Sequence, residues 1–312
     1  MTAPRRKKIS LIGAGNIGGT MAHIALQKGL GDIVLFDVVP GMPQGKALDL
    51  MEMRPVDHLD GKVTGTNDWS DCRDSDLFVV TAGLARKPGM SRDDLIATNS
   101  RIMKDVAGHI REIAPQAHVI VISNPLDAMV SLCKQVTGFP RERVMGMAGA
   151  LDTARFRFFV ADELGVSVEN ISAFVLGGHG DDMVPLPRYC SVAGIPLEKL
   201  LSSERIEAIV GRTRMAGGEI VKLLGTGSAY YSPAACAMKM AEAILTDRKW
   251  IIPCAAYLEG EYGVERLFVG VPVTLGAGGV EKIHEVELSE TERQAFHQSV
   301  EHVRQLVASL GS

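Results

Sequence analysis

The sequence lacks the hydrophobic segments of a secreted or membrane-embedded chain. No stretch reaches 18 unbroken apolar residues, so we expect no transmembrane helix. The basic run at residues 5–8 is not followed by a signal-peptide core, because glycines interrupt the next apolar residues at once. We expect this run to be solvated chain leading into the first strand, and a nucleic-acid role is the alternative.

Cysteine is also scarce, and the chain has no excess of positive charge. The five cysteines are odd in number, widely spaced and form no C-x-x-C pair, which argues against a disulfide framework and against a zinc site. We therefore expect no metal and a reducing, cytoplasmic location. A formal net charge of −4 provides no large positive field, so neither nucleic acid nor a membrane is an expected partner. A small anionic substrate would have to be bound by local arginines.

The first half alternates short apolar runs with amphipathic segments. Strands are expected at residues 9–12, 33–36, 77–80, 119–122 and 144–147, with helices after residue 15 and at 44–53, 93–113 and 128–136. This alternation predicts an α/β fold with a mostly parallel, doubly wound sheet, in which ligands bind at the carboxyl ends of the strands.

A glycine-rich turn joins the first expected strand to the first helix. Its residues are Gly13, Ala14, Gly15, Asn16, Ile17 and Gly18. The first glycine permits a tight turn, the second lets the backbone approach a pyrophosphate, and the third lets the helix pack close to the strand. The motif alone is weak evidence, but here a strand precedes it and a helix follows, so we predict a dinucleotide site in a Rossmann-type domain.

Asp37 ends the second expected strand, 19 residues after Gly18. A carboxylate there can accept hydrogen bonds from both ribose hydroxyls and would repel a 2′-phosphate, which favours NAD over NADP. The alternative is an ordinary aspartate at a strand-to-loop junction.

Two further segments follow strands of the expected sheet. Residues 81–92 form a basic, glycine-punctuated loop with Arg86 and Arg92, which we interpret as a lid that carries guanidinium groups onto a bound anion; a solvated loop is the alternative. Ile122, Ser123 and Asn124 end the strand at 119–122 and are expected beside the cofactor, although an Asn-Pro turn that caps the next helix is also possible.

The second half begins with a long amphipathic helix from residue 149, so we place an NAD-binding domain at residues 1–148 and an α+β substrate domain at 149–312. Asp152 and Arg155 share one face of that helix at i and i+3. An expected strand at 171–176 leads to His179 in a glycine-rich loop. We predict that Asp152 orients His179 as a general base and that Arg155 binds a substrate carboxylate. A surface ion pair and an idle turn histidine are the alternatives.

The segments at residues 13–18, 85–92, 123–127, 151–155 and 177–181 resemble the lactate and malate dehydrogenase family, in matching order and spacing across almost the whole chain. The resemblance implies that His179 is the proton acceptor, that Asp152 orients it, and that Arg155 binds the C1 carboxylate of the substrate. It further implies that Arg92 polarises the reacting oxygen, that Asn124 contacts substrate, and that Asn99 contacts NAD.

Substrate choice depends on Arg86. Members of the family that use lactate typically carry glutamine at this place, and those that use malate carry arginine. A second guanidinium suits a second carboxylate, so the resemblance implies reversible oxidation of (S)-malate to oxaloacetate, a tricarboxylic acid cycle reaction, by a homo-oligomer that is a tetramer rather than a dimer. Lactate oxidation and a non-catalytic NAD-binding sensor remain the alternatives. A hydrolase on a related fold would need metal ligands that the sequence does not supply.

Overall fold

The computed structural model describes residues 5–84 and 92–311, with the side chains of residues 92, 93 and 311 outside the description. The long helices are α1 (Asn16–Gln27), α2 (Met42–Asp57), α3 (Arg92–Ile113), α4 (Leu126–Thr137), α5 (Ala148–Leu164), α6 (Ser203–Leu224), α7 (Tyr231–Leu245) and α8 (Glu290–Ala308). The main-sheet strands are β1 (Lys8–Ile12), β2 (Asp32–Phe36), β3 (Val63–Thr66), β4 (Leu77–Val80), β5 (His118–Val121), β6 (Val144–Gly146), β12 (Trp250–Glu259), β13 (Glu265–Gly276) and β14 (Gly279–Ile283).

Nine strands form one sheet in the order β14-β13-β12-β6-β5-β4-β1-β2-β3. The six strands from the first half are parallel, as the alternation predicts, and β12 to β14 join them antiparallel. The predicted doubly wound α/β fold is confirmed. The second half contributes more than a separate layer, because its longest strands extend the sheet of the first half.

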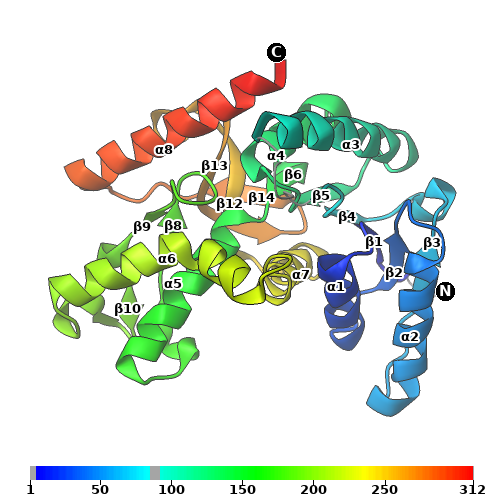
Figure 1. Ribbon diagram of the computed structural model, residues 1–312, viewed down its shortest axis with the longest axis horizontal. Coiled ribbons are helices and arrows are strands. Elements are labelled where there is room, and N and C mark those ends of the chain that lie inside the picture. Colours follow the sequence, from blue (N-terminus) through cyan, green and yellow to red (C-terminus); the bar gives the residue numbers. More distant parts are fainter. Residues whose placement is uncertain (1–4, 85–91, 312) are drawn as a thin grey trace.

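Side chains alternate between the two faces of the sheet and build two cores. On β4, Phe78 and Val80 face the core that contains α3 and α4, whereas Leu77 and Val79 face the core of α1 and α7. All four are fully buried, and burial of each such side chain contributes about 1.5–3 kcal/mol. Figure 1 shows α3, α4 and α8 on one side of the sheet and α1 and α7 on the other. A strand covered on both faces needs a continuous apolar run, which explains why β4 is recognisable in the sequence.

The prediction of a single strand at residues 171–176 is wrong. It is divided into β7 (Ile171–Ser172) and β8 (Val175–Leu176), which belong to different small sheets. β7 pairs with β10 (Ser191–Val192), itself paired with β11 (Ile195–Pro196), while β8 pairs with β9 (Val184–Pro185). The division occurs because the chain changes partners at Ala173 and Phe174, which an unbroken apolar pattern does not reveal.

The edge strand β3 has no counterpart among the predicted elements. Its sequence Val-Thr-Gly-Thr has little apolar content, since it pairs on one side only, with β2. A Cβ on Gly65 would overlap the backbone of Pro43, so this glycine permits the close approach of α2. α2 is also longer than the 44–53 helix expected from the sequence.

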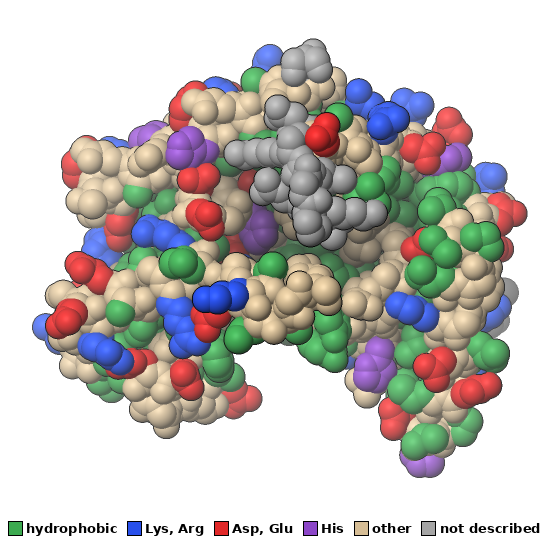
Figure 2. Space-filling view, in the orientation of Figure 1, with side chains coloured by type: hydrophobic (Ala, Val, Ile, Leu, Met, Phe, Trp, Pro, Cys, Tyr) green, Lys and Arg blue, Asp and Glu red, His purple; other side chains and the backbone are tan. Residues whose placement is uncertain are grey.

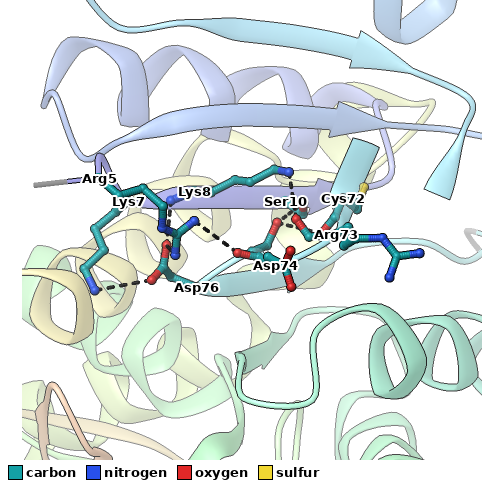
Figure 3. A network of polar contacts seen from close by, with 9 residues as sticks. Arg5, Lys7, Lys8, Ser10, Cys72, Arg73, Asp74 and Asp76 are labelled. Atoms are coloured by element: carbon teal, nitrogen blue, oxygen red, sulfur yellow. Dashed lines mark hydrogen bonds and ion pairs between the residues drawn. The ribbon is translucent and has the colours of Figure 1, made fainter. Parts of the chain in front are cut away.

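The basic residues near the amino end are bound to the sheet. Asp76 accepts hydrogen bonds from Arg5 Nη2 at 3.0 Å, Lys7 Nζ at 3.3 Å and the Lys8 backbone at 2.8 Å (Figure 3). Lys8 Nζ also donates to the carbonyl oxygen of Arg73 at 2.8 Å. Residues 5–7 are exposed and lead into β1, as the sequence led us to expect, and Asp76, just before β4, pairs with residues of this run.

Within the described residues, no helix is both long and apolar enough to cross a membrane.

Candidate active site

The glycine-rich turn lies between β1 and α1 at the carboxyl end of the sheet. Gly13 has a φ of +110° and donates its amide to Phe36 O at 2.8 Å, which closes the turn against β2. A Cβ on Gly18 would overlap the carbonyl oxygen of Gly13, whereas a Cβ on Gly15 would meet nothing within 4 Å. Gly18 is thus required for packing, and the space beside Gly15 is open for a ligand to approach the backbone.

The amino end of α1 is suited to an anion. Its N-cap, Gly15, provides no side-chain cap, and Gly15 and Asn16 are exposed, while Ala14 is buried and Ile17 is half-buried. Unpaired N–H groups and the helix dipole favour a pyrophosphate at this position. These features fit the predicted dinucleotide.

Asp37 lies directly beside this turn. Its Oδ2 accepts a hydrogen bond from Ala14 N at 2.6 Å, and its Oδ1 accepts one from Val39 N at 3.0 Å. The carboxylate therefore holds the glycine turn and the end of β2 together, and its contact with a ribose stays a prediction.

The side chain of Asn99 connects the end of β5 to the segment that follows β4. Its Nδ2 donates to Asn124 O at 2.7 Å and to Leu84 O at 3.1 Å, and its Oδ1 accepts from Leu84 N at 2.8 Å. Asn99 is 2% exposed and both of its amide hydrogens are used, so its side chain holds the backbone here, and the contact with NAD that the resemblance implies stays a prediction.

The end of β5 holds the other predicted cofactor-side residues. Ile122 and Ser123 are buried, and Ser123 Oγ donates to Ala82 O at 2.5 Å. Asn124 is exposed, and its side-chain amide makes no hydrogen bond in the described part of the chain. Among these residues, Asn124 is the one whose side chain can reach a small ligand.

The loop that carries His179 is positioned by its neighbours on both sides. Before it, Val175 N donates to Thr153 Oγ1 at 3.1 Å, which fixes β8 against α5. Gly177, with a φ of +87°, forms a bridge with Gly270 of β13, with 2.9 Å between N and O in each direction. These contacts bring the loop over the helix that carries Asp152.

His179, Asp152 and Arg155 form one connected group. His179 Nδ1 lies 3.0 Å from Asp152 Oδ2, and Arg155 Nη1 donates to Asp152 Oδ1 at 3.3 Å. The aspartate side chain is 2% exposed, the arginine 13% and the histidine 17%. The surface ion pair considered for Asp152 and Arg155 is therefore wrong, because neither side chain is on the surface. The neighbouring Phe158, by contrast, is 52% exposed, so the helix is not packed all round.

The electrostatics favour a charged imidazole. Burial acts to lower the pKa of His179, but the negative charge of Asp152, its hydrogen bond and the charge of Asp127 outweigh burial, so the pKa is raised. Because Nδ1 faces a carboxylate, it carries the proton that donates to Asp152, which leaves Nε2 to exchange a proton with a ligand.

The guanidinium of Arg155 has an unpaired hydrogen-bond donor among the described residues. Its Nε is buried without a hydrogen-bond partner among the described residues, and a Cβ on Gly217 of α6 would lie only 3.5 Å from Nη2. A buried guanidinium with unused donors is suited to a carboxylate ligand, since such donors are costly to leave unpaired.

The side chains of the two loop arginines lie outside the description. Arg86 lies outside the described residues, and Arg92 is the first residue of α3 with a side chain outside the description. Their predicted roles remain predictions.

The sequence did not identify Asp127, Thr153 or Ser299 as part of the site. Asp127 Oδ2 accepts from His179 N at 2.9 Å, and Ser299 Oγ accepts from Gly178 N at 2.8 Å. Burial and desolvation raise the pKa of Asp127 to about 6. A carboxylate in the first turn of a helix after a sheet strand is a signal that could have indicated Asp127. Ser299, on α8, offers no comparable signal in the sequence.

Within residues 5–84 and 92–311, no group of three or more histidine, cysteine or acidic residues is arranged to hold a metal ion.

Two family models cover almost the whole chain. Residues 7–146 match the lactate/malate dehydrogenase NAD binding domain, and residues 149–309 match the lactate/malate dehydrogenase alpha/beta C-terminal domain. The first match confirms the predicted cofactor, NAD, at the level of the family.

Individual relatives agree with these models. Malate dehydrogenase 1 of Anaeromyxobacter dehalogenans is 59% identical over 306 residues, which are 97% of this chain and 98% of that protein. The solved malate dehydrogenase of Cryptosporidium parvum is 46% identical with a TM-score of 0.96, covering 98% of this chain and 99% of its own. The lactate dehydrogenase of the same organism, solved with lactic acid and β-nicotinamide adenine dinucleotide, is 43% identical with a TM-score of 0.96, covering 99% of both chains. The chain therefore belongs to the lactate/malate dehydrogenase family.

Proposed function

We propose that this protein is an NAD-dependent malate dehydrogenase, which reversibly oxidises (S)-malate to oxaloacetate. The connected group of His179, Asp152 and Arg155 carries the proposal. The relatives named malate dehydrogenase, 56–59% identical over nearly the full length, support the choice of substrate.

In this proposal His179 takes the proton of the malate hydroxyl at Nε2. Its Nδ1 hydrogen bond to the buried Asp152 holds the ring in the required tautomer and stabilises the imidazolium that results. The reverse reaction, reduction of oxaloacetate, starts from the protonated ring. A raised pKa of His179 keeps that form populated near neutral pH.

Arg155 binds the C1 carboxylate through its unpaired donors, and its tie to Asp152 fixes the guanidinium relative to the histidine. One scaffold, α5, thus sets the distance between the bound carboxylate and the proton acceptor. Asn124 contacts the substrate from the end of β5, and Arg92 stabilises charge on the reacting oxygen. Holding the substrate in this way lowers the entropic part of the barrier.

NAD is held by the glycine turn, the amino end of α1 and Asp37, with Ile122 and Ser123 lining the same edge of the sheet. Bound NAD supplies the acceptor for the hydride that leaves C2 of malate. The carboxylate of Asp37 selects NAD by repelling a 2′-phosphate.

Arg86 distinguishes malate from lactate in this proposal. The fold cannot do so, because relatives of both names share it at a TM-score of 0.96. A lactate-sized ligand would leave the Arg86 guanidinium without a carboxylate, at a cost on the order of 3 kcal/mol or roughly a hundredfold in kcat/KM.

A spectrophotometric assay of NADH oxidation with oxaloacetate and with pyruvate tests the proposal. We expect oxaloacetate to be preferred, and Arg86→Gln to move the preference toward pyruvate by roughly a hundredfold. His179→Ala should lower kcat by about 10²–10⁴ while NADH binding persists. A preference for pyruvate would refute the assignment of malate as substrate. Tight NADH binding without turnover of either substrate would favour a non-catalytic NAD-binding sensor.

We further propose that the protein is a homotetramer. Large apolar side chains are exposed on two helices, and exposed apolar surface can be covered where subunits of an oligomer meet. They include Leu48 and Val56 of α2 and Met215 and Leu223 of α6. Figure 2 shows part of this surface over α2 as green side chains. Light scattering after gel filtration should give four times the mass of 33.5 kDa, and a monomer would contradict the proposal.

We also place the protein in the cytoplasm, with its reaction in the tricarboxylic acid cycle. Its five cysteines are all free, which suits a reducing compartment. Fractionation of the source cells followed by the oxaloacetate assay tests the location, and activity confined to a secreted or envelope fraction would contradict it.

A further inference from the structure

Three consecutive amides of the His179 loop are held by three different elements. Gly177 N donates to Gly270 O of β13 at 2.9 Å, and Gly178 N donates to Ser299 Oγ of α8 at 2.8 Å. His179 N donates to Asp127 Oδ2 of α4 at 2.9 Å. The first two acceptors are neutral, and the third is a carboxylate.

Burial of the Asp127 carboxylate at this position costs folding free energy. The residue is 3% exposed, and its Oδ1 is buried with no hydrogen-bond partner in the described part of the chain. The first turn of α4 offers partial compensation through the helix dipole. A neutral side chain would accept the His179 amide hydrogen bond with a smaller desolvation penalty, as Ser299 does for Gly178. The need to anchor the loop therefore does not explain why a charged residue is present.

The charge acts on the imidazole of His179. The charged side chains that influence this ring are Asp152 and Arg155 on α5 and Asp127 on α4, and the two carboxylates act in the same direction. On α8, the residues nearest the loop glycines are Ser299 and Val303, which carry no charge.

We propose that Asp127 is a second positioning carboxylate for His179. Through Oδ2 it fixes the backbone of the proton acceptor, and its negative charge joins that of Asp152 in stabilising the imidazolium that forms when the malate hydroxyl gives up its proton. The inference rests on the proposed role of His179 as proton acceptor.

The two carboxylates have separate duties. Asp152 bonds the ring directly and sets the tautomer, whereas Asp127 has its hydrogen bond to the backbone and reaches the ring by charge alone. Replacing Asp127 by a neutral acceptor should therefore change the pH dependence of the reaction while leaving the tautomer intact. Ionised Asp127 and protonated His179 stabilise each other, so proton binding at the two sites is linked.

The decisive variant is Asp127→Asn, because the asparagine Oδ1 can still accept from the His179 amide. We expect the alkaline limb of oxaloacetate reduction to move to lower pH, so that kcat/KM at pH 9 falls about tenfold further relative to its maximum than in the parent, the factor for one pKa unit. The acid limb of malate oxidation should move to lower pH as well.

Two controls separate charge from anchoring. Ser299→Ala removes a neutral anchor of the same loop and should lower kcat without moving the limbs of the pH profile. Asp182→Asn removes another carboxylate of this loop, which pairs with His302 and whose side chain is 48% exposed. This variant should move neither the alkaline limb of oxaloacetate reduction nor the acid limb of malate oxidation. If Ser299→Ala moves the limbs as far as Asp127→Asn does, the charge of Asp127 has no special role and the proposal fails.

A readout without turnover keeps the inference separate from the proposed function. The imidazole of His179 can be titrated by NMR in protein with ¹⁵N-labelled histidine, and assigned by its loss in His179→Asn. The pKa of His179 should be lower in Asp127→Asn than in the parent, and an unchanged value overturns the inference even if malate is oxidised. If Asp127→Asn does not fold, Asp127→Ser takes its place in the titration. A parent protein without oxaloacetate turnover would instead refute the proposed function, and the titration would still decide the electrostatic claim.

Discussion

Nδ1 of His179 lies 3.0 Å from Oδ2 of Asp152, and the aspartate is almost wholly buried. A carboxylate shielded from water interacts strongly with a neighbouring charge. The pair therefore controls both the orientation of the ring and its affinity for a proton.

Asp152→Asn tests this pair. Burial of His179 acts to lower its pKa, and the charge of Asp152 is the largest influence that raises it. Without that charge, protonated His179 should be lost at lower pH, so oxaloacetate reduction should decline earlier as pH rises. We expect kcat to fall by about 10²–10⁴ at neutral pH. Profiles of kcat/KM against pH measure both effects, and a profile that keeps its midpoint would contradict the assignment.

Arg155→Lys tests the carboxylate site. A lysine keeps the charge but loses the planar pair of donors, so the KM for oxaloacetate should rise about a hundredfold, with a smaller loss in kcat. NADH affinity, followed by fluorescence, should be unchanged, because Arg155 does not belong to the glycine turn. An unaltered KM would exclude Arg155 as the carboxylate ligand.

Gly18→Ala and Gly15→Ala form a matched pair at the cofactor turn. The methyl group at residue 18 would overlap Gly13 O, so this variant should lose at least about 2 kcal/mol of unfolding free energy in urea. The methyl group at residue 15 meets only open space, so stability should be kept while the Kd for NADH rises about tenfold or more. Equal stability losses in both variants would refute this division of roles.

Asp127→Asn should change stability with a characteristic pH dependence. The pKa of Asp127 is raised to about 6 from 3.8, so the folded chain binds this proton more tightly than the unfolded chain. Ionisation of Asp127 therefore costs stability above pH 6, and that cost disappears as pH falls toward 3.8. The variant should be more stable than the parent by about 1–3 kcal/mol at pH 7.5, with the gain shrinking by pH 4.5. Urea unfolding of both proteins at pH 7.5 and at pH 4.5 measures this gain in stability. A stability difference that does not change with pH would contradict the prediction.

The sequence predicted those elements whose burial is uniform. β4 is covered on both faces, and its Leu-Phe-Val-Val run shows this directly. β3 is an edge strand with one glycine and two threonines among its four residues, so its pattern is too weak to recognise. The break between β7 and β8 depends on which strands each of them pairs with, and that information is not local.

The site shows the same distinction. Asp152 and Arg155 were predictable because helical spacing places them on one face, and His179 because glycines surround it. The hydrogen bond from His179 to Asp127 spans 52 residues and depends on how α4 meets the loop. The hydrogen bonds that the Asn99 side chain makes to the backbone of Leu84 and Asn124 likewise depend on packing that is not local in the sequence.

The junction between the two halves of the sheet has a consequence for how the protein unfolds. β6 and β12 meet where Gly146 opposes Ala255, and a side chain at residue 146 would crowd both Ala255 and Leu126. A continuous sheet across this junction makes the two halves one cooperative unit, since separating them would expose an unpaired strand edge. The protein has two tryptophans, Trp69 in the first half and Trp250 on β12, and both should therefore report the same denaturation midpoint.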